Sequence, residues 1–331
     1  MASSSSSKTP IQSSNVPSSV QPGGGFCMSL ELAWGRLRRA WLRRARPGYV
    51  RRMIEKRQGQ CENCSHDIID PRDLKFQRNL CGYWFRDEDD RFRWRGRLGL
   101  ARAGLAEVVI FSLLFLILSL GLAGAAWLSL AYASGSVLVI SWIFWPILGM
   151  LAIVWLEVVL FFRDPRRKIP DDLQALVSPA DGTVTNIDEV SDADFPGGRA
   201  FRISIFLSIF NVHVNRVPRT GRVVALRYIA GEFLDARHAE CPVRNEQLWI
   251  DFQEDQNSRL LRVKQISGAI ARRIVCWLKI GEEVYAGDRF GMIKFGSRTE
   301  VLLPTRQAME IRVKVGDKVK GGSTILLRFP C

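Results

Sequence analysis

Three cysteines and one histidine lie close together in the first third of the chain: Cys61, Cys64, His66 and Cys81. Thiolate and imidazole groups at such spacings are typical zinc ligands. The second close pair of a four-ligand zinc site is missing, and Ser65 separates Cys64 from His66, unlike a haem attachment motif. Two interpretations stay open, a metal site or a small structural cluster of reduced cysteines, and the missing pair favours the second.

A second group of reactive side chains lies in the C-terminal half. Gly296 and Ser297 separate two strand-like stretches, and a Gly-Ser pair at such a place is commonly a structural turn. Asp181 precedes Gly182, which locally indicates a turn aspartate before a tight glycine turn. A serine hydroxyl is a weak nucleophile, so any chemistry at Ser297 requires a base.

Only three histidines are available as that base. His66 lies in the N-terminal region and His238 in a polar stretch that we expect to be exposed. His213 follows a strongly apolar stretch and precedes a polar turn, where its side chain can face a cleft. The alternative for His213 is a hydrogen-bonded core histidine.

A long apolar run predicts membrane helices. The 49 residues between Glu107 and Glu157 contain no Asp, Glu, Lys or Arg, and as one helix they would be roughly 74 Å long, more than twice the roughly 30 Å of the hydrocarbon core. The run must therefore cross twice. A break at 134–136 predicts helices over about 105–131 and 137–162, with Pro146 a kink in the second.

Arginine and lysine flank both outer ends of this hairpin, and its turn contains none. The positive-inside rule therefore places the N-terminal region and everything after Phe162 in the cytoplasm. The seven cysteines, an odd number in a chain too large to need disulfides, also favour reducing, cytoplasmic surroundings. The alternative, a pair of buried core helices, is disfavoured by the length of the run.

The region before the hairpin is strongly basic. The chain has a net charge of +14, and ten Arg or Lys residues lie within Arg36 to Arg57. Residues 1–29 are expected to be a disordered tail and 30–104 a basic region whose apolar residues at helical spacing suit an anionic membrane surface. A solvated basic arm and nucleic-acid binding are the alternatives; the adjacent membrane segment favours lipid phosphate and argues against nucleic acid.

Residues 163–331 form one domain whose alternating polar and apolar residues predict mainly strands: 201–205, 222–228, 262–266, 289–295, 301–304 and 310–315. Only 268–278 suits a short helix. The turns at 279–284 and 315–322 resemble those of lipoyl-carrier sandwiches. The expected fold class is a β-rich α+β domain, barrel-like or sandwich-like, joined to the transmembrane hairpin.

Five segments in this domain resemble one family in its own order: 161–165 (FFRDP), 178–182 (SPADG), 206–216 (FLSIFNVHVNR), 265–276 and 289–304. The family is the pyruvoyl-dependent phosphatidylserine decarboxylases, in particular their short, membrane-tethered form. The resemblance implies that Ser297 attacks the carbonyl of Gly296 and converts the peptide bond to an ester. Elimination then cuts the chain between 296 and 297 and leaves a pyruvoyl cofactor at position 297.

The resemblance also implies site residues. It pairs Asp181 with His213 and Ser297 in an acyl-transfer relay, in which the aspartate orients the imidazole. Longer relatives have two histidines three residues apart, and here Arg216 replaces the second, which leaves open the step that His213 serves. Arg272 and Arg273, among apolar neighbours, are candidates for lipid-phosphate contact or, equally, solvated arginines.

The implied activity is decarboxylation of phosphatidylserine to phosphatidylethanolamine, with the pyruvoyl ketone forming a Schiff base with the amine and withdrawing electrons as carbon dioxide leaves. The partners would be phosphatidylserine, an anionic membrane surface and the chain's own cleavage products, a β chain of residues 1–296 and an α chain of 297–331; self-association is left open. Two alternatives remain: the same chemistry on another serine phospholipid, or a non-catalytic membrane-anchored β-sandwich that recruits partners.

Overall fold

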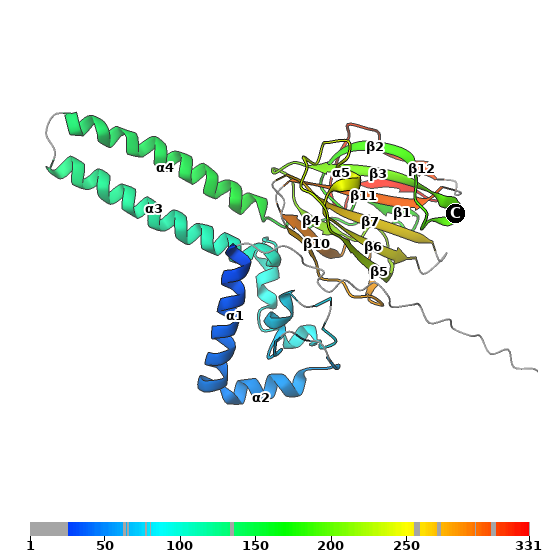
Figure 1. The fold of residues 1–331 in the computed structure, drawn as a ribbon, viewed down its shortest axis with the longest axis horizontal. Helices are drawn as coiled ribbons and strands as arrows, with labels where there is room; N and C mark the ends of the chain where they lie inside the picture. The colour runs from blue at the N-terminus through cyan, green and yellow to red at the C-terminus, as the bar shows by residue number, and fades with distance from the viewer. Residues whose placement is uncertain are drawn as a thin grey trace, which may run out of the picture.

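The computed structural model describes residues 26–61, 64, 66–76, 78–79, 81–132, 136–254, 259–269, 273–294, 296–305 and 309–330. A basic N-terminal region, a long helical hairpin and a β domain follow one another along the chain (Figure 1). Residues 1–25 of the expected tail lie outside the described part, whereas 26–29 already belong to the first helix.

Two helices begin the N-terminal region, α1 (Phe26–Ala45) and α2 (Pro47–Lys56). Pro47 is the first residue of α2, a position for which the fixed φ of proline is well suited. Trp34, Leu37 and Trp41 of α1 are exposed. Four short 3-10 helices follow: Pro71–Phe76, Asp87–Asp89, Arg93–Arg97 and Arg102–Gly104. The apolar residues at helical spacing therefore lie on a helix, and these side chains are left uncovered by the described residues.

The hairpin consists of α3 (Leu105–Tyr132) and α4 (Ser136–Phe161), close to the expected boundaries, and the predicted break falls at residues outside the described part. Each helix is long and apolar enough to cross a membrane, and almost no residue of the two apolar spans is buried. The helices touch through the stacked rings of Phe115 and Trp155, whose Nε1 donates to Ser112 Oγ at 2.9 Å. This exposure argues against a pair of soluble core helices.

An eight-stranded sheet dominates the β domain, and its paired strands are antiparallel. In spatial order it contains β13 (Lys318–Val319), β2 (Gly182–Ser191), β3 (Arg199–Leu207), β11 (Ser297–Pro304), β7 (Leu260–Ser267), β6 (Gln247–Gln253), β5 (Gly221–Ile229) and β9 (Glu283–Val284). The strands expected at 201–205, 222–228, 262–266 and 301–304 are all confirmed.

Two three-stranded sheets complete the domain. One contains β4 (Val214–Arg216), β10 (Arg289–Lys294) and β8 (Arg273–Cys276), and the other contains β1 (Ala175–Val177), β14 (Ile325–Arg328) and β12 (Glu310–Ile311). Short helices lie at Pro196–Gly198 and at α5 (Cys241–Arg244).

The prediction of a short helix within 268–278 is wrong, because residues 273–276 form strand β8. Ile274 of β8 joins the main core and Val275 joins a second apolar cluster that includes Phe161 and Phe162. β-Branched residues whose side chains alternate between two buried faces favour a strand, and pairing with β10 decides the outcome. The strand expected over 310–315 is confined to Glu310–Ile311.

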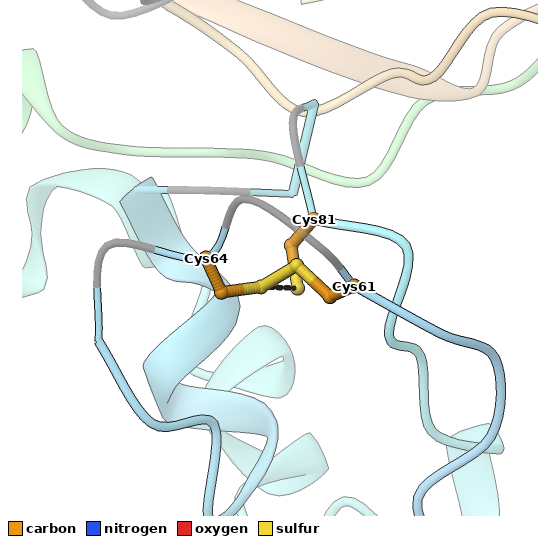
Figure 2. A group of neighbouring side chains, drawn as sticks. All are labelled: Cys61, Cys64 and Cys81. Carbon is orange, nitrogen blue, oxygen red and sulfur yellow. Dashed lines mark hydrogen bonds between the residues drawn. A yellow bond between two sulfur atoms is a disulfide. The ribbon is translucent and has the colours of Figure 1, made fainter.

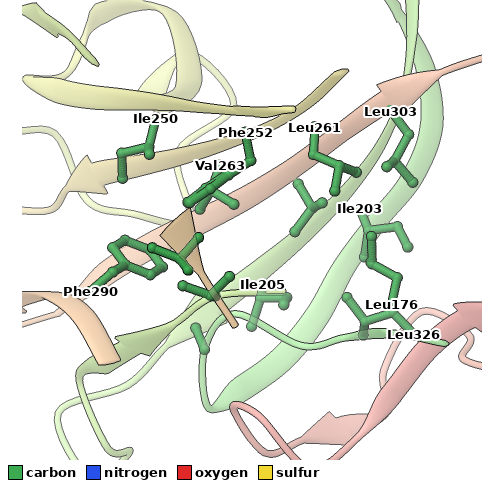
Figure 3. Close-up of a cluster of buried hydrophobic side chains, with 14 of the residues drawn as sticks. Leu176, Ile203, Ile205, Ile250, Phe252, Leu261, Val263, Phe290, Leu303 and Leu326 are labelled. Carbon is green, nitrogen blue, oxygen red and sulfur yellow. The ribbon is translucent and has the colours of Figure 1, made fainter. Parts of the chain in front are cut away.

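The main core lies between the large sheet and the two smaller ones (Figure 3). Ile203 and Ile205 of β3, Val263 of β7 and Leu303 of β11 meet Phe290 of β10 there, and each is fully buried. Because side chains alternate along a strand, every second residue of these strands points into this core.

We expect Phe252→Ala to lower the free energy of unfolding by about 3–5 kcal/mol, the usual result of emptying a buried phenylalanine site. Phe252 is fully buried on β6 and its ring meets that of Phe290 edge-on at 6.1 Å. Denaturant titration in detergent measures the change. Phe210→Ala is the matched control: Phe210 is 66% exposed, so its loss should cost less than about 0.5 kcal/mol. Equal losses would contradict the assignment of the core.

Candidate active site

The Gly296-Ser297 bond lies where the chain passes from β10 to β11. Gly296 has a φ of 60°, in the left-handed region that favours glycine, and a Cβ added there would meet no atom within 4 Å. Backbone conformation, and not lack of space, therefore accounts for the glycine. The next residue, Ser297, is the first of β11, so the bond joins a glycine turn to a regular strand.

Ser297 lies in the middle of the large sheet. It pairs with Leu207 of β3 on one side and with Ser267 of β7 on the other. Its side chain is fully buried, and Oγ has no hydrogen-bond partner among the described residues. A buried hydroxyl without a partner is costly, and such exceptions mark sites under a functional constraint.

The inward face of the large sheet changes from apolar to polar near Ser297, at the start of β11 and the end of β7. Along β11, Val301 and Leu303 face the core, and the strand period of two places Thr299 and Ser297 on the same face. β7 repeats the pattern on the neighbouring strand, where two core residues are followed by two polar ones: Leu261, Val263, Gln265 and Ser267. The polar members of both strands are fully buried. They form a polar layer against the Gly296-Ser297 bond.

Strand β4 closes this polar layer from the smaller sheet. Asn215 donates from Nδ2 to Thr299 Oγ1 at 3.3 Å, and its Oδ1 accepts from Gln265 Nε2 at 2.8 Å. Asn215 is itself fully buried. The three residues connect β4, β7 and β11 through side-chain hydrogen bonds, which sets the register of the two sheets at the site.

His213 directly precedes β4 and is fully buried. Its Nδ1 lies 2.9 Å from the carbonyl oxygen of Asn211, and since a carbonyl only accepts, Nδ1 carries the proton. Nε2 is then an acceptor, and it is buried without a partner among the described residues. The ring lies 4.3 Å, centroid to centroid, from Phe161 at the end of α4. Burial lowers the pKa of His213 to about 4, so the imidazole is neutral at physiological pH.

Asp181 belongs to a different hydrogen-bond network. Its Oδ2 accepts from Arg167 at 2.7 Å, and its Oδ1 accepts from the backbone N–H of Gly321 at 2.8 Å. The imidazole of His213 is oriented by Asn211 instead. The hydrogen bonds of Asp181 and of His213 therefore go to different partners, and a relay that includes Asp181 stays a prediction.

The model of the phosphatidylserine decarboxylase family matches residues 156–327. A phosphatidylserine decarboxylase proenzyme of Rhodopirellula baltica is 41% identical over 257 residues, which cover 77% of this chain and 99% of the relative. The chain belongs to the phosphatidylserine decarboxylase family.

Proenzymes of the same name from Desulfotalea psychrophila and Carboxydothermus hydrogenoformans are 42% and 46% identical, over 61% and 56% of this chain and 90% and 85% of theirs. All the residues of the polar layer lie within the matched family region.

Arg216, at the position where longer family members have a second histidine, is buried. It donates to Asp164 at 2.8 Å and to the carbonyl oxygen of Gly287 at 3.0 Å. Asp164 also pairs with Arg289 of β10. Arg216 therefore ties the segment that leaves α4 to the small sheet, which is a structural task.

Arg272 and Arg273 were the two candidates for contact with the lipid phosphate. Arg272 lies outside the described residues. Arg273 is only 6% exposed, and its guanidinium lies 3.9 Å from Glu107 at the base of α3. Glu107 also pairs with Lys294, a buried residue that precedes Ser297 by three positions in the sequence. Lipid contact stays a prediction for Arg272, and burial argues against it for Arg273.

The residues that the sequence did not single out are Asn215, Gln265, Ser267 and Thr299, together with Gly268. A Cβ added at Gly268 would lie 2.5 Å from the carbonyl oxygen of Gly296, the group that cleavage must attack. The sequence signal that could have found them is the strand period of two. Gln265 and Ser267 lie two and four residues after Val263, on the face of the strand that is otherwise apolar.

We expect Gly268→Ala to slow self-cleavage by roughly ten- to a hundredfold, because the new methyl group displaces the Gly296 carbonyl and small misplacements of a reacting group cost that much. Pulse-labelled precursor, followed by gel electrophoresis, gives the rate. Gly48→Ala in α2, where an added Cβ meets nothing within 4 Å, should cleave at the normal rate. Normal cleavage by a folded Gly268→Ala protein would remove this residue from the site.

Proposed function

We propose that the chain is a proenzyme that cuts itself between Gly296 and Ser297 and then decarboxylates phosphatidylserine to phosphatidylethanolamine and carbon dioxide at a membrane. The observation that carries the proposal is the buried, partnerless Oγ of Ser297, directly after a glycine with positive φ, in a chain of this family. A non-catalytic β-sandwich has no need for an unsatisfied hydroxyl in its core.

Self-cleavage begins at Ser297. Its Oγ attacks the carbonyl carbon of Gly296, and the peptide bond is exchanged for an ester as the amide nitrogen becomes the amine of residue 297. Loss of the Cα proton then expels the Gly296 carboxylate, and the resulting dehydroalanine takes up water and releases ammonia to give the ketone. Gly296 has no side chain to obstruct the attack on its carbonyl carbon, and its positive φ is one that glycine adopts readily.

His213 is the base that we assign to the first step. Its Nε2 is an unprotonated, partnerless acceptor, which is the state that a general base requires. His213 precedes Asn215 by two residues, and Ser297 precedes Thr299 by two. The hydrogen bond between Asn215 and Thr299 joins the strands that follow the two residues, which supports a role for His213 beside Ser297.

The pyruvoyl group formed at position 297 would lie among buried hydrogen-bonding side chains, Gln265, Ser267 and Thr299, which suit its carbonyl oxygens and its amide. When present it supplies an electron sink for the loss of carbon dioxide. His213 would deliver the proton to the carbon that loses the carboxyl group. Burial of all these side chains excludes bulk water and so protects the proton transfer.

The two product chains stay together because the strands interlock. Strand β11 of the 297–331 chain lies between β3 and β7, both of the 1–296 chain. Strands β12, β13 and β14 of the short chain also pair in the sheets, β13 with β2 and β14 with β1. Separation would break two complete ladders in the centre of a sheet.

The membrane arrangement suits a lipid substrate. The hairpin would hold the β domain at the surface, with the domain and the basic α1 helix on the cytoplasmic side, because the arginines flank its outer ends. Exposed Trp34, Leu37 and Trp41 on α1 would enter the interface of an anionic membrane. The acidic substrate headgroup and the basic arm would then occupy the same surface.

We expect Ser297→Ala to remain one full-length chain without activity, because no hydroxyl is left to attack. Intact-mass measurement should find the wild-type chain cut after Gly296, with a short chain that begins with a ketone. Release of labelled carbon dioxide from carboxyl-labelled phosphatidylserine in detergent tests the reaction. Ser204→Ala, a buried serine on neighbouring β3 that donates to Glu300, should still be cut and active.

Two chains in the Ser297→Ala protein would exclude Ser297 as the nucleophile. A mature, ketone-bearing wild type that releases no carbon dioxide from phosphatidylserine would limit the proposal to self-processing and direct the search to another serine phospholipid.

The low pKa of His213 predicts the pH profile of self-cleavage. The neutral imidazole is the base, so the rate should stay constant from neutral pH through pH 6.5 and fall only as the pH approaches about 4. Cell-free precursor inserted in liposomes allows the rate to be followed by gel. His238→Gln, a change in an exposed loop, should keep this profile, and His213→Gln should abolish cleavage. A midpoint near pH 6.5 would show that His213 is not buried as described.

A further inference from the structure

The cysteines of the N-terminal region form one compact group. The Sγ atoms of Cys61, Cys64 and Cys81 all lie within 4.8 Å of one another, and those of Cys64 and Cys81 are 2.7 Å apart (Figure 2). Cys61 and Cys64 are joined as a disulfide. Cys81 is buried and approaches this pair from a separate loop. His66 is not part of the group, and its Nε2 lies 3.2 Å from the carbonyl oxygen of Asp73.

One disulfide does not account for this arrangement. A bond between residues three apart closes a very short loop and so removes little entropy from the unfolded chain. It also leaves the Cys81 thiol pressed against Cys64, closer than two unbonded sulfur atoms normally pack. A divalent cation bound by three thiolates solves both problems, because sulfurs around a tetrahedral zinc ion lie about 3.8 Å apart.

The two loops that carry the cysteines are built to approach closely. Gln58 and Trp84 form an antiparallel bridge that closes the segment at its two ends. Inside it, a Cβ at Gly82 would lie 1.8 Å from the carbonyl oxygen of Gln60, and a Cβ at Gly59 would lie 2.2 Å from that of Gly82. Only glycine allows such backbone contact. The close approach of the two loops brings the three cysteine sulfur atoms near enough to share one ion.

The segment between α2 and α3 has little regular structure and a small apolar core to stabilise it. Among the described residues between α2 and α3, regular structure is limited to 3-10 helices and isolated bridges. Among the described residues its apolar cluster is small: Ile69 packs with Leu42 of α1 and with Tyr49 and Val50 of α2. Small units without a sufficient core depend on metals or other cross-links. An ion bound to Cys61, Cys64 and Cys81 would close a loop of about twenty residues, which a Cys61–Cys64 bond does not.

The cluster also lies at the contact between the N-terminal region and the β domain. Lys279 Nζ donates to the carbonyl oxygens of Cys81 at 2.6 Å and Tyr83 at 3.4 Å. Arg78 pairs with Glu282 of the same loop at 2.9 Å. Three thiolates around one divalent cation have a net charge of −1, and the Lys279 ammonium ion beside Cys81 balances it.

We propose that Cys61, Cys64 and Cys81 bind one zinc-type divalent cation as thiolates, with a solvent molecule as the fourth ligand, and that this site fixes the N-terminal region to the β domain through Lys279. The Cys61–Cys64 bond must first be opened by two electrons from a thiol reductant, such as the glutathione of a reducing compartment, which gives two cysteine thiols and an oxidised disulfide of the reductant. Binding of the cation then releases the three thiol protons without further electron transfer. Thiolates select zinc over magnesium or calcium. The site is separate from the polar layer around Ser297.

The test is metal analysis of the full-length protein purified in detergent from reducing cells. Elemental mass spectrometry should find about one zinc ion per chain, and Cys81→Ser should lower this content by roughly tenfold or more. Cys241→Ala is the matched control, because Cys241 is buried in another cluster with Ala236 and Ile266. It should retain the full metal content.

A second measurement covers the case in which Cys81→Ser fails to fold. Exchange of the wild-type protein into cobalt should give the thiolate-to-metal and tetrahedral absorption bands of a cysteine site, and zinc should remove them. The proposal is overturned if the wild type contains no stoichiometric metal and takes up no cobalt, or if peptide mapping under alkylating conditions finds a Cys61–Cys64 disulfide in the protein from reducing cells.

Discussion

Strand β11 pairs with β3 along its whole length and with β7 from Ser297 to Leu302, and the bond at which we propose cleavage immediately precedes its first residue. Ser297 is thereby fixed between Leu207 and Ser267, whereas Gly296 leaves the sheet with a positive φ. The hydroxyl of the proposed nucleophile is thus held by the sheet, whereas the carbonyl that it would attack belongs to a glycine turn without a side chain to obstruct the approach. The same ladders keep the products together, because the new chain end lies inside the sheet.

The apolar hairpin of α3 and α4 contributes residues to the surroundings of the candidate site. Phe161, the last residue of α4, packs against the ring of His213 and helps to bury it. At the base of α3, Glu107 pairs with Lys294 only three residues before Ser297, and Lys294 also donates to the carbonyl oxygen of Ala103. Burial lowers the pKa of Lys294 to about 8. Removing either partner of such a buried pair leaves an uncompensated charge, so the hairpin and the cleavage strand depend on each other.

Sequence periodicity predicted the hairpin and most strands, because these depend on runs and alternations of local residues. It failed at β8, where partners distant in sequence override a weak local preference for helix. It also failed to identify the polar layer. Gln265 and Thr299 follow the same alternation as the apolar residues Val263 and Val301, which places them on the inward face. The packing of β4 against both strands shows that this part of the face is enclosed. Family resemblance selected Ser297 and His213 as reactive candidates, but not the side chains that surround them.

The hydrogen bond at His213 Nδ1 is chemically suited to the first step. A carboxylate partner would stabilise the imidazolium and raise its pKa, whereas the neutral carbonyl of Asn211 fixes the tautomer and leaves the low pKa of a buried base. Asp181 meanwhile binds the N–H of Gly321, a residue of the 297–331 chain. In this state its carboxylate therefore links the two future product chains, and it would reach His213 only after the contacts with both Gly321 and Arg167 are broken.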